Sequence, residues 1–161
     1  MYPKFGRELM LCSVRRLYMI VAFCGHRQVE EGEAVCRWLE KVIDVLAREG
    51  AEECWFGGKG QFSRCAAEAV TKLKTKHPHL RRVLVQAYMN QEGDPLLYDE
   101  KMYPPIEDAP LRFAMQRRDR YMALNADVVV TYAKYGWGNS TATKELAQRK
   151  GKRVINYPDE P

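Results

Sequence analysis

An uncharged apolar run that ends at a glycine is the feature that most constrains this chain. Residues Tyr18–Cys24 read YMIVAFC, and Gly25, His26, Arg27 and the acidic segment Glu30–Glu33 follow them. A short apolar run stopped by glycine is typical of a strand covered on both faces, as in the middle of a parallel sheet. We therefore predict a central strand, a polar turn and a helix start. Open α/β folds hold phosphates with this unit, although an ordinary βα connection has the same pattern.

Strand and helix patterns alternate along the rest of the chain. Further strands are predicted at Glu53–Phe56, Arg82–Tyr88, Asp127–Ala133 and Arg153–Tyr157, and helices at Glu31–Gly50, from an N-cap at Ser63, at Pro110–Leu124 and at Ser140–Lys150. This alternation predicts an α/β fold, a Rossmann-like parallel sheet of about five strands with helices on both faces. Numbered along the chain, the strands are expected in the order 3-2-1-4-5, with the ligand site beside strands one and four.

Two segments carry more specific predictions. In Glu31–Gly50 the apolar residues recur at helical spacing, which predicts one buried stripe ending at the glycine stop. That stripe consists of Val35, Trp38, Leu39, Val42, Ile43 and Leu46. The long connection Met89–Glu107 holds glycine, three prolines and two tyrosines, so it is interpreted as a functional lid, with disorder as the alternative.

The length and charge of the chain limit the classes of protein to which it can belong. At 161 residues it fits one domain, which we assign to residues 18–161, with residues 1–17 as an N-terminal extension. The net charge is +5, and the extension, with four basic residues and one glutamate, carries +3 of it. The remaining +2 argues against binding of nucleic acid, which needs a clustered basic face. No apolar run approaches the ~20 residues of a membrane span, so a soluble protein without a membrane partner is expected.

The cysteines favour neither a metal site nor disulfide bonds. There are five of them, an odd number, and no two are spaced as a C-x-x-C pair. Their positions are Cys12, Cys24, Cys36, Cys54 and Cys65. Metal sites need several converging ligands, usually with short-spaced pairs. Buried free thiols in a reducing cytoplasm are therefore expected, with no metal and no cofactor.

Three glycine-containing turns should meet at one rim of the sheet, because each follows a predicted parallel strand. They are Gly25–Arg27, Gly57–Gly60 and Gly136–Thr141. His26 could act there as an acid or base, or could fix the loop as a neutral hydrogen-bonding residue. Trp137 could stack on a base or ribose, or could cap the core.

The ordered set of motifs resembles a known superfamily. MIVAFCGHR is followed by FGGKGQF, then by YPPIEDAPLRFAMQRRDRYM, and finally by NADVVVTYAKYGWGNSTATKELAQRKGKRVIN. Together these are similar to the SLOG superfamily, and within it to the YpsA-like families of bacteria and phages. The resemblance implies a Rossmann-like domain. SLOG members include cytokinin-activating phosphoribohydrolases, recombination mediators that load single-stranded DNA, and sensor domains for nucleotide-derived ligands.

Positions that match the superfamily's motifs are the predicted ligand contacts. The resemblance implies such contacts for Gly25, His26, Arg27, Gly57, Gly58, Gly60, Arg118, Arg120, Gly136, Trp137, Gly138, Asn139, Ser140 and Thr141. The hydrolases resemble P-G-G-x-G-T-x-x-E, with the glutamate three places after the threonine. Here Glu145 lies four places after Thr141, which puts hydrolysis in doubt, and Glu145 is the acid/base candidate if the protein is a hydrolase.

The expected function is binding of a nucleotide or nucleotide-derived phosphate by a sensor or accessory protein. The partner would then be a nucleotide-like small molecule, and a homo-oligomer stays open. One alternative is a hydrolase that cleaves a nucleotide N-glycosidic bond through Glu145. The other alternative is a binder of single-stranded nucleic acid, against which the small charge of residues 18–161 argues.

Overall fold

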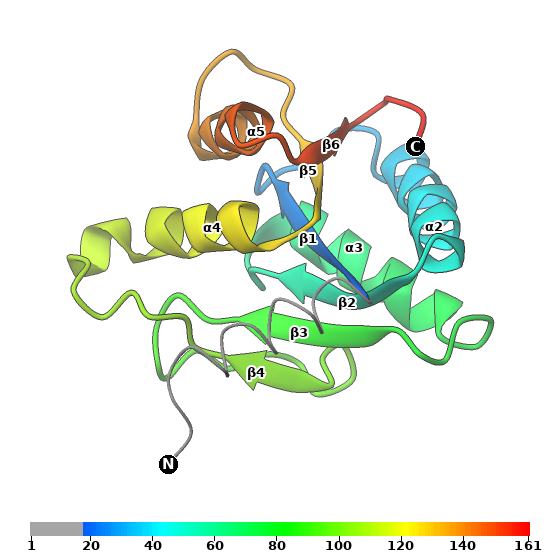
Figure 1. Ribbon diagram of the computed structural model, residues 1–161, viewed down its shortest axis with the longest axis horizontal. Coiled ribbons are helices and arrows are strands. Elements are labelled where there is room, and N and C mark those ends of the chain that lie inside the picture. Colours follow the sequence, from blue (N-terminus) through cyan, green and yellow to red (C-terminus); the bar gives the residue numbers. More distant parts are fainter. Residues whose placement is uncertain (1–17) are drawn as a thin grey trace, which may run out of the picture.

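Six parallel strands form the centre of the computed structural model, which describes residues 18–161 (Figure 1). The strands are β1 (Met19–Gly25), β2 (Ala51–Phe56), β3 (Arg81–Val85), β4 (Glu100–Met102), β5 (Val128–Tyr132) and β6 (Arg153–Asn156). The helices are α2 (Gly32–Arg48), α3 (Gly60–Leu73), the 3₁₀ turn η1 (Leu111–Phe113), α4 (Ala114–Asn125) and α5 (Asn139–Arg149). The order across the sheet is β4-β3-β2-β1-β5-β6, so the predicted parallel α/β fold is confirmed.

Strand β1 lies in the middle of the sheet and is covered on both faces, as its apolar run predicts (Figure 1). Val21 and Phe23 pack with α2 and α3 on one face. Ala22 and Cys24 pack with α4 and α5 on the other. Successive side chains of a strand point to opposite faces of the sheet. Both faces of β1 are buried, so its run has no polar residues.

Helix α2 confirms the predicted apolar stripe, since all six of its residues are buried. The helix begins at Gly32 rather than at Glu31, because Glu31 has a left-handed backbone with φ 58° and ends the preceding turn. Gly50, with φ +114°, provides the expected stop after the helix.

The start of α3 differs from the prediction. The helix begins at Gly60, three residues before Ser63, so Ser63 is not its N-cap. Its hydroxyl oxygen instead accepts a hydrogen bond of 3.0 Å from the backbone N–H of Gly58. A serine side chain can cap a helix or bond a nearby loop. Here the glycine loop lies close enough for Ser63 to bond the N–H of Gly58.

The segment Met89–Glu107 contains a strand that was not predicted. β4 pairs with β3 through the register Val83↔Glu100, Leu84↔Lys101 and Val85↔Met102, which makes the sheet six-stranded rather than about five-stranded. Its three residues read EKM and show neither alternation nor β-branched side chains. The order of the five predicted strands is unaffected.

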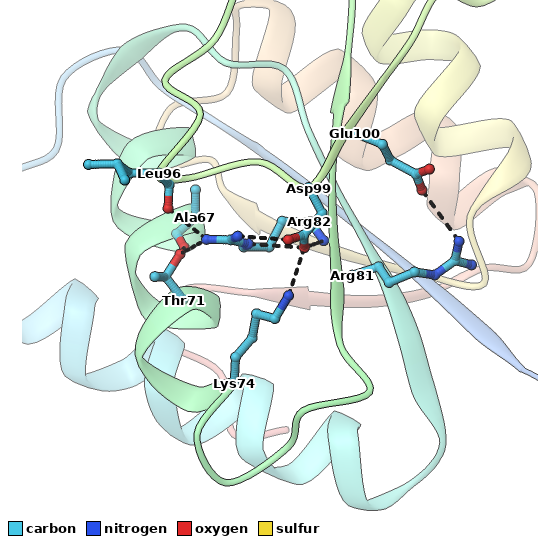
Figure 2. Close-up of polar contacts among 8 residues, drawn as sticks. All are labelled: Ala67, Thr71, Lys74, Arg81, Arg82, Leu96, Asp99 and Glu100. Atoms are coloured by element: carbon cyan, nitrogen blue, oxygen red, sulfur yellow. Dashed lines mark hydrogen bonds and ion pairs between the residues drawn. The ribbon is translucent and has the colours of Figure 1, made fainter.

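A buried arginine fastens this added edge to the sheet (Figure 2). The guanidinium of Arg82, 9% exposed, bonds both carboxylate oxygens of Asp99, at 2.8 and 3.1 Å. It also donates to the Thr71 hydroxyl and to the Leu96 carbonyl, both at 2.7 Å. Lys74 completes the cluster with an ion pair of 2.9 Å to Asp99. The cluster therefore joins β3 and α3 to the segment that leads into β4.

The remaining sequence predictions have mixed outcomes. Of the cysteines, Cys24 and Cys54 are buried free thiols, Cys36 and Cys65 are free and partly exposed, and Cys12 lies outside the described residues. The predicted extension, residues 1–17, also lies outside them. Between residues 18 and 161, no helix has the length and apolar character needed to cross a membrane.

Candidate functional site

A cavity of about 350 Å³ opens at the carboxyl ends of β1 and β2, and we call it the cationic pocket. The turn after β1, the turn after β2, helix α4 and the start of α5 all contribute to its wall. Its lining residues are Phe23, Cys24, Gly25, His26, Arg27, Gly57, Lys59, Ser63, Arg112, Met115, Gln116, Arg118, Asp119, Asn139 and Ser140. β1 lies between β2 and β5, so the pocket occupies the switch point where open α/β sheets bind ligands.

Close backbone contact joins the turns after β1 and β2. The N–H of Gln61 donates to the carbonyl of Arg27 at 2.7 Å. Gly60 has φ +86°, and a Cβ at this residue would lie 2.7 Å from the Cα of Arg27. Only glycine fits there, because both the backbone conformation and the space exclude a side chain. The glycine loop thus holds the Arg27 turn against the start of α3.

The pocket contains more positive charge than its carboxylate can balance. Four cationic side chains line it, and Asp119 is the one carboxylate in the lining. Asp119 pairs with Arg118. Among the described residues, no carboxylate oxygen lies within 4.0 Å of Arg27, Lys59 or Arg112. The pocket is therefore electrostatically suited to an anion.

Arg118 lies in the pocket wall with 3% of its surface exposed. One of its terminal nitrogens donates to the carbonyl of Gly57 at 2.6 Å and to that of Val85 at 3.3 Å. Its Nε donates to Asp119 at 2.7 Å. A Cβ on Gly57 would lie 2.7 Å from the guanidinium carbon. Arg118 thus links α4 to the ends of β2 and β3, and most of its hydrogen-bonding capacity is used by the protein.

The turn after β1 is fixed by His26. The Nε2 atom of His26 accepts a hydrogen bond of 3.0 Å from the backbone N–H of Lys134, and the backbone N–H of His26 donates to the carbonyl of Tyr132 at 3.2 Å. Burial lowers the pKa of His26, which keeps the ring neutral near pH 7. A neutral His26 ring whose Nε2 accepts a hydrogen bond fits the second of its two predicted roles, which is to fix the loop.

The amino end of α5 faces the same pocket through Asn139 and Ser140. Gly138 is the N-cap, and because it is a glycine it has no side chain to cap the helix. The first-turn N–H groups of a helix lack intrahelical partners and carry the positive end of its dipole. The Asn139 side chain donates to Asp119, which aligns α5 with α4. Helix-end amides and cationic side chains thus converge on one cavity.

Beside the pocket, three rings form a column that ends in solvent. The His26 ring lies 5.1 Å from the Tyr135 ring, and Tyr135 stacks on Trp137 at 5.4 Å and 16°. Trp137 is 73% exposed and Tyr135 is 45% exposed. A concavity of about 630 Å³, lined by all three rings and by Arg27, lies along this column. Trp137 therefore does not cap the core, contrary to one of its two predicted roles.

A second basic concavity lies between α4 and α5, and we call it the arginine groove. It measures about 850 Å³ and shares Gln116 and Asn139 with the cationic pocket. Arg117, Arg120 and Arg149 line it, and no carboxylate side chain is among its lining residues. Within residues 18–161, these three arginines have no carboxylate oxygen within 4.0 Å.

The structure brings about half of the predicted site residues together. Gly25, His26, Arg27, Gly57, Arg118, Asn139 and Ser140 line the cationic pocket. Gly58 and Gly60 shape the loop behind it, Arg120 lies in the arginine groove, and Trp137 and Gly138 lie beside the aromatic column. Gly136 is exposed and Thr141 is buried, and neither lines one of these three concavities.

Sequence reasoning missed Lys59 and Arg112, which join Arg27 in the pocket and have no carboxylate partner within residues 18–161. Lys59 lies inside the glycine loop, and a lysine between glycines was a signal available from the sequence alone. Arg112 precedes α4 in η1, and nothing in the sequence indicated that this turn reaches the rim.

The catalytic candidate Glu145 lies away from the pocket. It is exposed on α5 and is absent from the linings of the cationic pocket, the arginine groove and the aromatic concavity. Burial raises the pKa of the Cys24 thiol, so that group stays protonated at the pocket floor. No cluster of three or more potential metal ligands occurs in the part of the chain that the structure describes.

Comparison with known proteins identifies the fold. No protein-family model matches the chain, and no curated protein matches it in sequence. Among solved structures, DNA processing protein A from Streptococcus pneumoniae is similar with a TM-score of 0.64 and 21% identity over 89% of this chain. The match covers 51% of that protein, so this chain spans about half of its length.

Two further structures have the same fold. DNA processing protein A from Helicobacter pylori, which is described as having a unique single-stranded DNA binding mode, matches with a TM-score of 0.63 and 16% identity. That match covers 92% of this chain and 69% of the other. The molybdenum cofactor carrier protein from Chlamydomonas reinhardtii matches with a TM-score of 0.60 and 15% identity, covering 86% and 76%. At 15–21% identity these likenesses show a shared fold, which is the Rossmann-like fold that the sequence predicted.

Proposed function

We propose that this Rossmann-like domain binds the phosphate group of a nucleotide or nucleotide-derived ligand in the cationic pocket, as a sensor or accessory protein. One observation carries the proposal: Arg27, Lys59 and Arg112 converge on the pocket without a carboxylate partner among the described residues. Elsewhere on the domain most cations are paired, as Arg81 is with Glu53 and Glu100. Unpaired cations around a cavity favour an anionic ligand.

The chemistry of the lining suits a phosphate group. A guanidinium presents a fork of N–H donors that matches two phosphate oxygens, and a lysine adds a point charge. The amino end of α5, which also lines the pocket, contributes backbone N–H groups and the helix dipole. A cavity of about 350 Å³ is within the size range of small-molecule sites.

The nucleotide part of the proposal rests on the superfamily. The motif likeness to YpsA-like SLOG families supports a nucleotide-derived ligand and a sensor or accessory role. The fold neighbours include a protein described as a carrier of the molybdenum cofactor and one described as binding single-stranded DNA. Both descriptions are compatible with a phosphate-bearing ligand at the carboxyl rim of the sheet.

Variants of the two cations that the motifs did not indicate test the phosphate site. We expect Lys59→Ala and Arg112→Ala each to weaken AMP binding about ten- to a hundredfold, because a charge-assisted hydrogen bond contributes roughly 1.5–3 kcal/mol. Isothermal titration calorimetry measures the affinities, and Lys150→Ala is the matched control because Lys150 is exposed on the chain just after α5. If both variants bind AMP as tightly as the wild type does, the phosphate site is not in this pocket.

The geometry favours binding over turnover. Glu145 is exposed outside the pocket, and Asp119, the carboxylate in the lining, is held by Arg118 and Asn139. A general acid must come within roughly 2.6–3.2 Å of its target atom, directly or through one water. We propose that the protein releases no free base from AMP. Base release that disappears in Glu145→Gln would establish the hydrolase alternative instead.

A second candidate function, binding of single-stranded nucleic acid, is favoured by the arginine groove. The small net charge of residues 18–161 does not exclude a local cluster of basic side chains. Arg117, Arg120 and Arg149 line a groove next to the cationic pocket, with which it shares Gln116 and Asn139. A strand with one phosphate in the pocket could lay its next phosphates along this groove.

The salt dependence of oligonucleotide binding distinguishes this candidate. Each phosphate contact on a single strand contributes about −0.7 to the slope of log K against log salt. If the groove arginines contact phosphates, replacing Arg117, Arg120 and Arg149 by Gln should reduce the slope by up to about 2 while leaving AMP affinity unchanged. The matched control replaces Arg37, Arg48 and Arg64, which pair with acids on α2 and α3. Equal slopes in both triple variants would argue against a strand in the groove.

A further inference from the structure

We infer that the stacked Tyr135–Trp137 pair is a binding subsite for the nucleobase of the ligand whose phosphate occupies the cationic pocket. This inference rests on the proposed function and adds a second point of recognition to it. The two sites lie next to one another, because His26 and Arg27 line both the cationic pocket and the aromatic concavity.

The exposure of Trp137 is the first argument. The other two tryptophans are core residues, 9% exposed for Trp38 and 3% for Trp55, and their indole N–H groups donate to Asp159 and Glu53. Trp137 is 73% exposed, and its indole N–H has no hydrogen-bond partner in residues 18–161. Because little of the Trp137 side chain is buried, it contributes little to the stability of the fold. A large exposed apolar side chain beside a ligand pocket favours a role in binding.

The order of the column is the second argument. Tyr135 lies between His26 and Trp137, with ring separations of 5.1 and 5.4 Å. The Tyr135 hydroxyl lies 3.4 Å from a carboxylate oxygen of Glu30, which also pairs with Lys134 at 3.1 Å. The Glu30 contact and the His26 ring thus position the Tyr135 ring, and Trp137 stacks on that ring. A nucleobase would bind to a preformed aromatic surface, which limits the loss of conformational entropy.

The geometry at the start of α5 is the third argument. Trp137 lies two residues before Asn139, whose side chain lines the cationic pocket. The intervening Gly138, with φ +100°, lets the chain turn sharply from the aromatic pair into the helix. A single ligand can therefore place its phosphate near the helix end and a flat base along the column. Stacking accepts any base, because every base has a π-face.

Calorimetry on the full chain with AMP and ribose 5-phosphate tests the subsite, because both carry the same phosphate and only AMP has a base. We expect AMP to bind about 5- to 150-fold more tightly, which corresponds to about 1–3 kcal/mol of stacking. Trp137→Leu should remove this difference and leave ribose 5-phosphate affinity unchanged. The matched control Trp137→Phe keeps an aromatic ring and should retain most of the difference.

Tryptophan fluorescence gives a second readout, since Trp38 and Trp55 are buried and Trp137 is exposed. AMP should quench the emission and ribose 5-phosphate should not. A short adenylate oligonucleotide tests whether the base belongs to a free nucleotide or to a single strand. If the oligonucleotide quenches the emission and AMP does not, the ligand is a single strand. Two results would overturn the inference. One is that Trp137→Leu binds both AMP and the oligonucleotide as tightly as the wild type does. The other is that neither ligand quenches the emission at millimolar concentration.

The two proposals fail in different ways. Adenosine has the base without the phosphate, so its quenching of Trp137 should persist in Lys59→Ala. If Lys59→Ala and Arg112→Ala both bind ribose 5-phosphate as wild type does, the phosphate site is wrong and the adenosine result still tests the stack. A third outcome is that the wild type self-associates, Trp137→Leu does not, and no ligand quenches the emission. That outcome would overturn the nucleobase subsite and show that Trp137 forms a contact between copies of the chain.

Discussion

Replacing Arg118 by methionine is expected to destabilise the fold by about 3 kcal/mol, because removing one partner of a buried, hydrogen-bonded charge pair costs roughly 3–5 kcal/mol. Methionine keeps most of the apolar stem but removes the bonds to the carbonyls of Gly57 and Val85 and to Asp119. For a domain of this size the melting temperature should fall by roughly 6–12 °C. Thermal unfolding followed by circular dichroism measures the change.

The neighbouring arginine provides the control for this prediction. Arg117 is exposed in the arginine groove, and Arg117→Met should change stability by less than about 0.5 kcal/mol. The motif likeness assigns Arg118 to the ligand, whereas its hydrogen bonds assign it to the wall that shapes the pocket. A variant that melts like wild type but has lost AMP binding would support direct ligand contact and contradict the structural role.

Asp99→Asn is expected to destabilise the fold by about 2 kcal/mol at pH 7, since a hydrogen bond to a charged group contributes roughly 1.5–3 kcal/mol and Asp99 is partly exposed. The amide keeps the shape of the side chain but leaves the buried guanidinium of Arg82 without its counter-charge. Urea unfolding at pH 7 measures the difference. The control is Glu100→Gln, because the ion pair of Glu100 with Arg81 is 3.4 Å long and half exposed, so it should contribute at most about 0.5 kcal/mol.

The pH dependence of this variant has a definite sign. Hydrogen bonds from Arg82 hold the pKa of Asp99 well below its usual 3.8 in the folded protein. As the pH falls below about 5, the unfolded chain therefore binds a proton that the folded protein does not, and the stability contributed by Asp99 declines. The gap between wild type and Asp99→Asn should narrow between pH 7 and pH 3. A gap that stays constant over this range would show that the ionisation of Asp99 is not the source of the stability difference.

The central part of the fold was predictable because it depends on local pattern. Seven residues without charge before Gly25 indicated a strand covered on both faces, and β1 is such a strand. The helical spacing of Val35 to Leu46 gave the buried face of α2. Short segments with weak patterns were missed. β4 reads EKM and is held by the Arg82 cluster, whose members are up to 28 residues apart in the sequence.

The candidate site was predictable in outline and not in its charges. Parallel strands end at one rim, so the turns at Gly25, Gly57 and Gly138 could be expected to lie near one another. Whether an arginine faces a ligand or a carbonyl depends on how its helix is rotated and which partners it meets. Arg118 meets the carbonyl of Gly57 and is buried, whereas Arg112, in the turn before α4, reaches the pocket without a carboxylate partner among the described residues.

The order of the five main strands, the buried faces of the helices and the meeting of the glycine turns at one rim could be predicted from the sequence. These follow from periodicity, glycine and chain connectivity, which act between residues close in the sequence. Three features became visible only in the folded domain: Lys59 and Arg112 share a pocket with Arg27, Glu145 lies outside that pocket, and Trp137 stacks on Tyr135 in solvent. Burial and pairing depend on groups brought together from different elements, and their energies are set by the partners that each group meets.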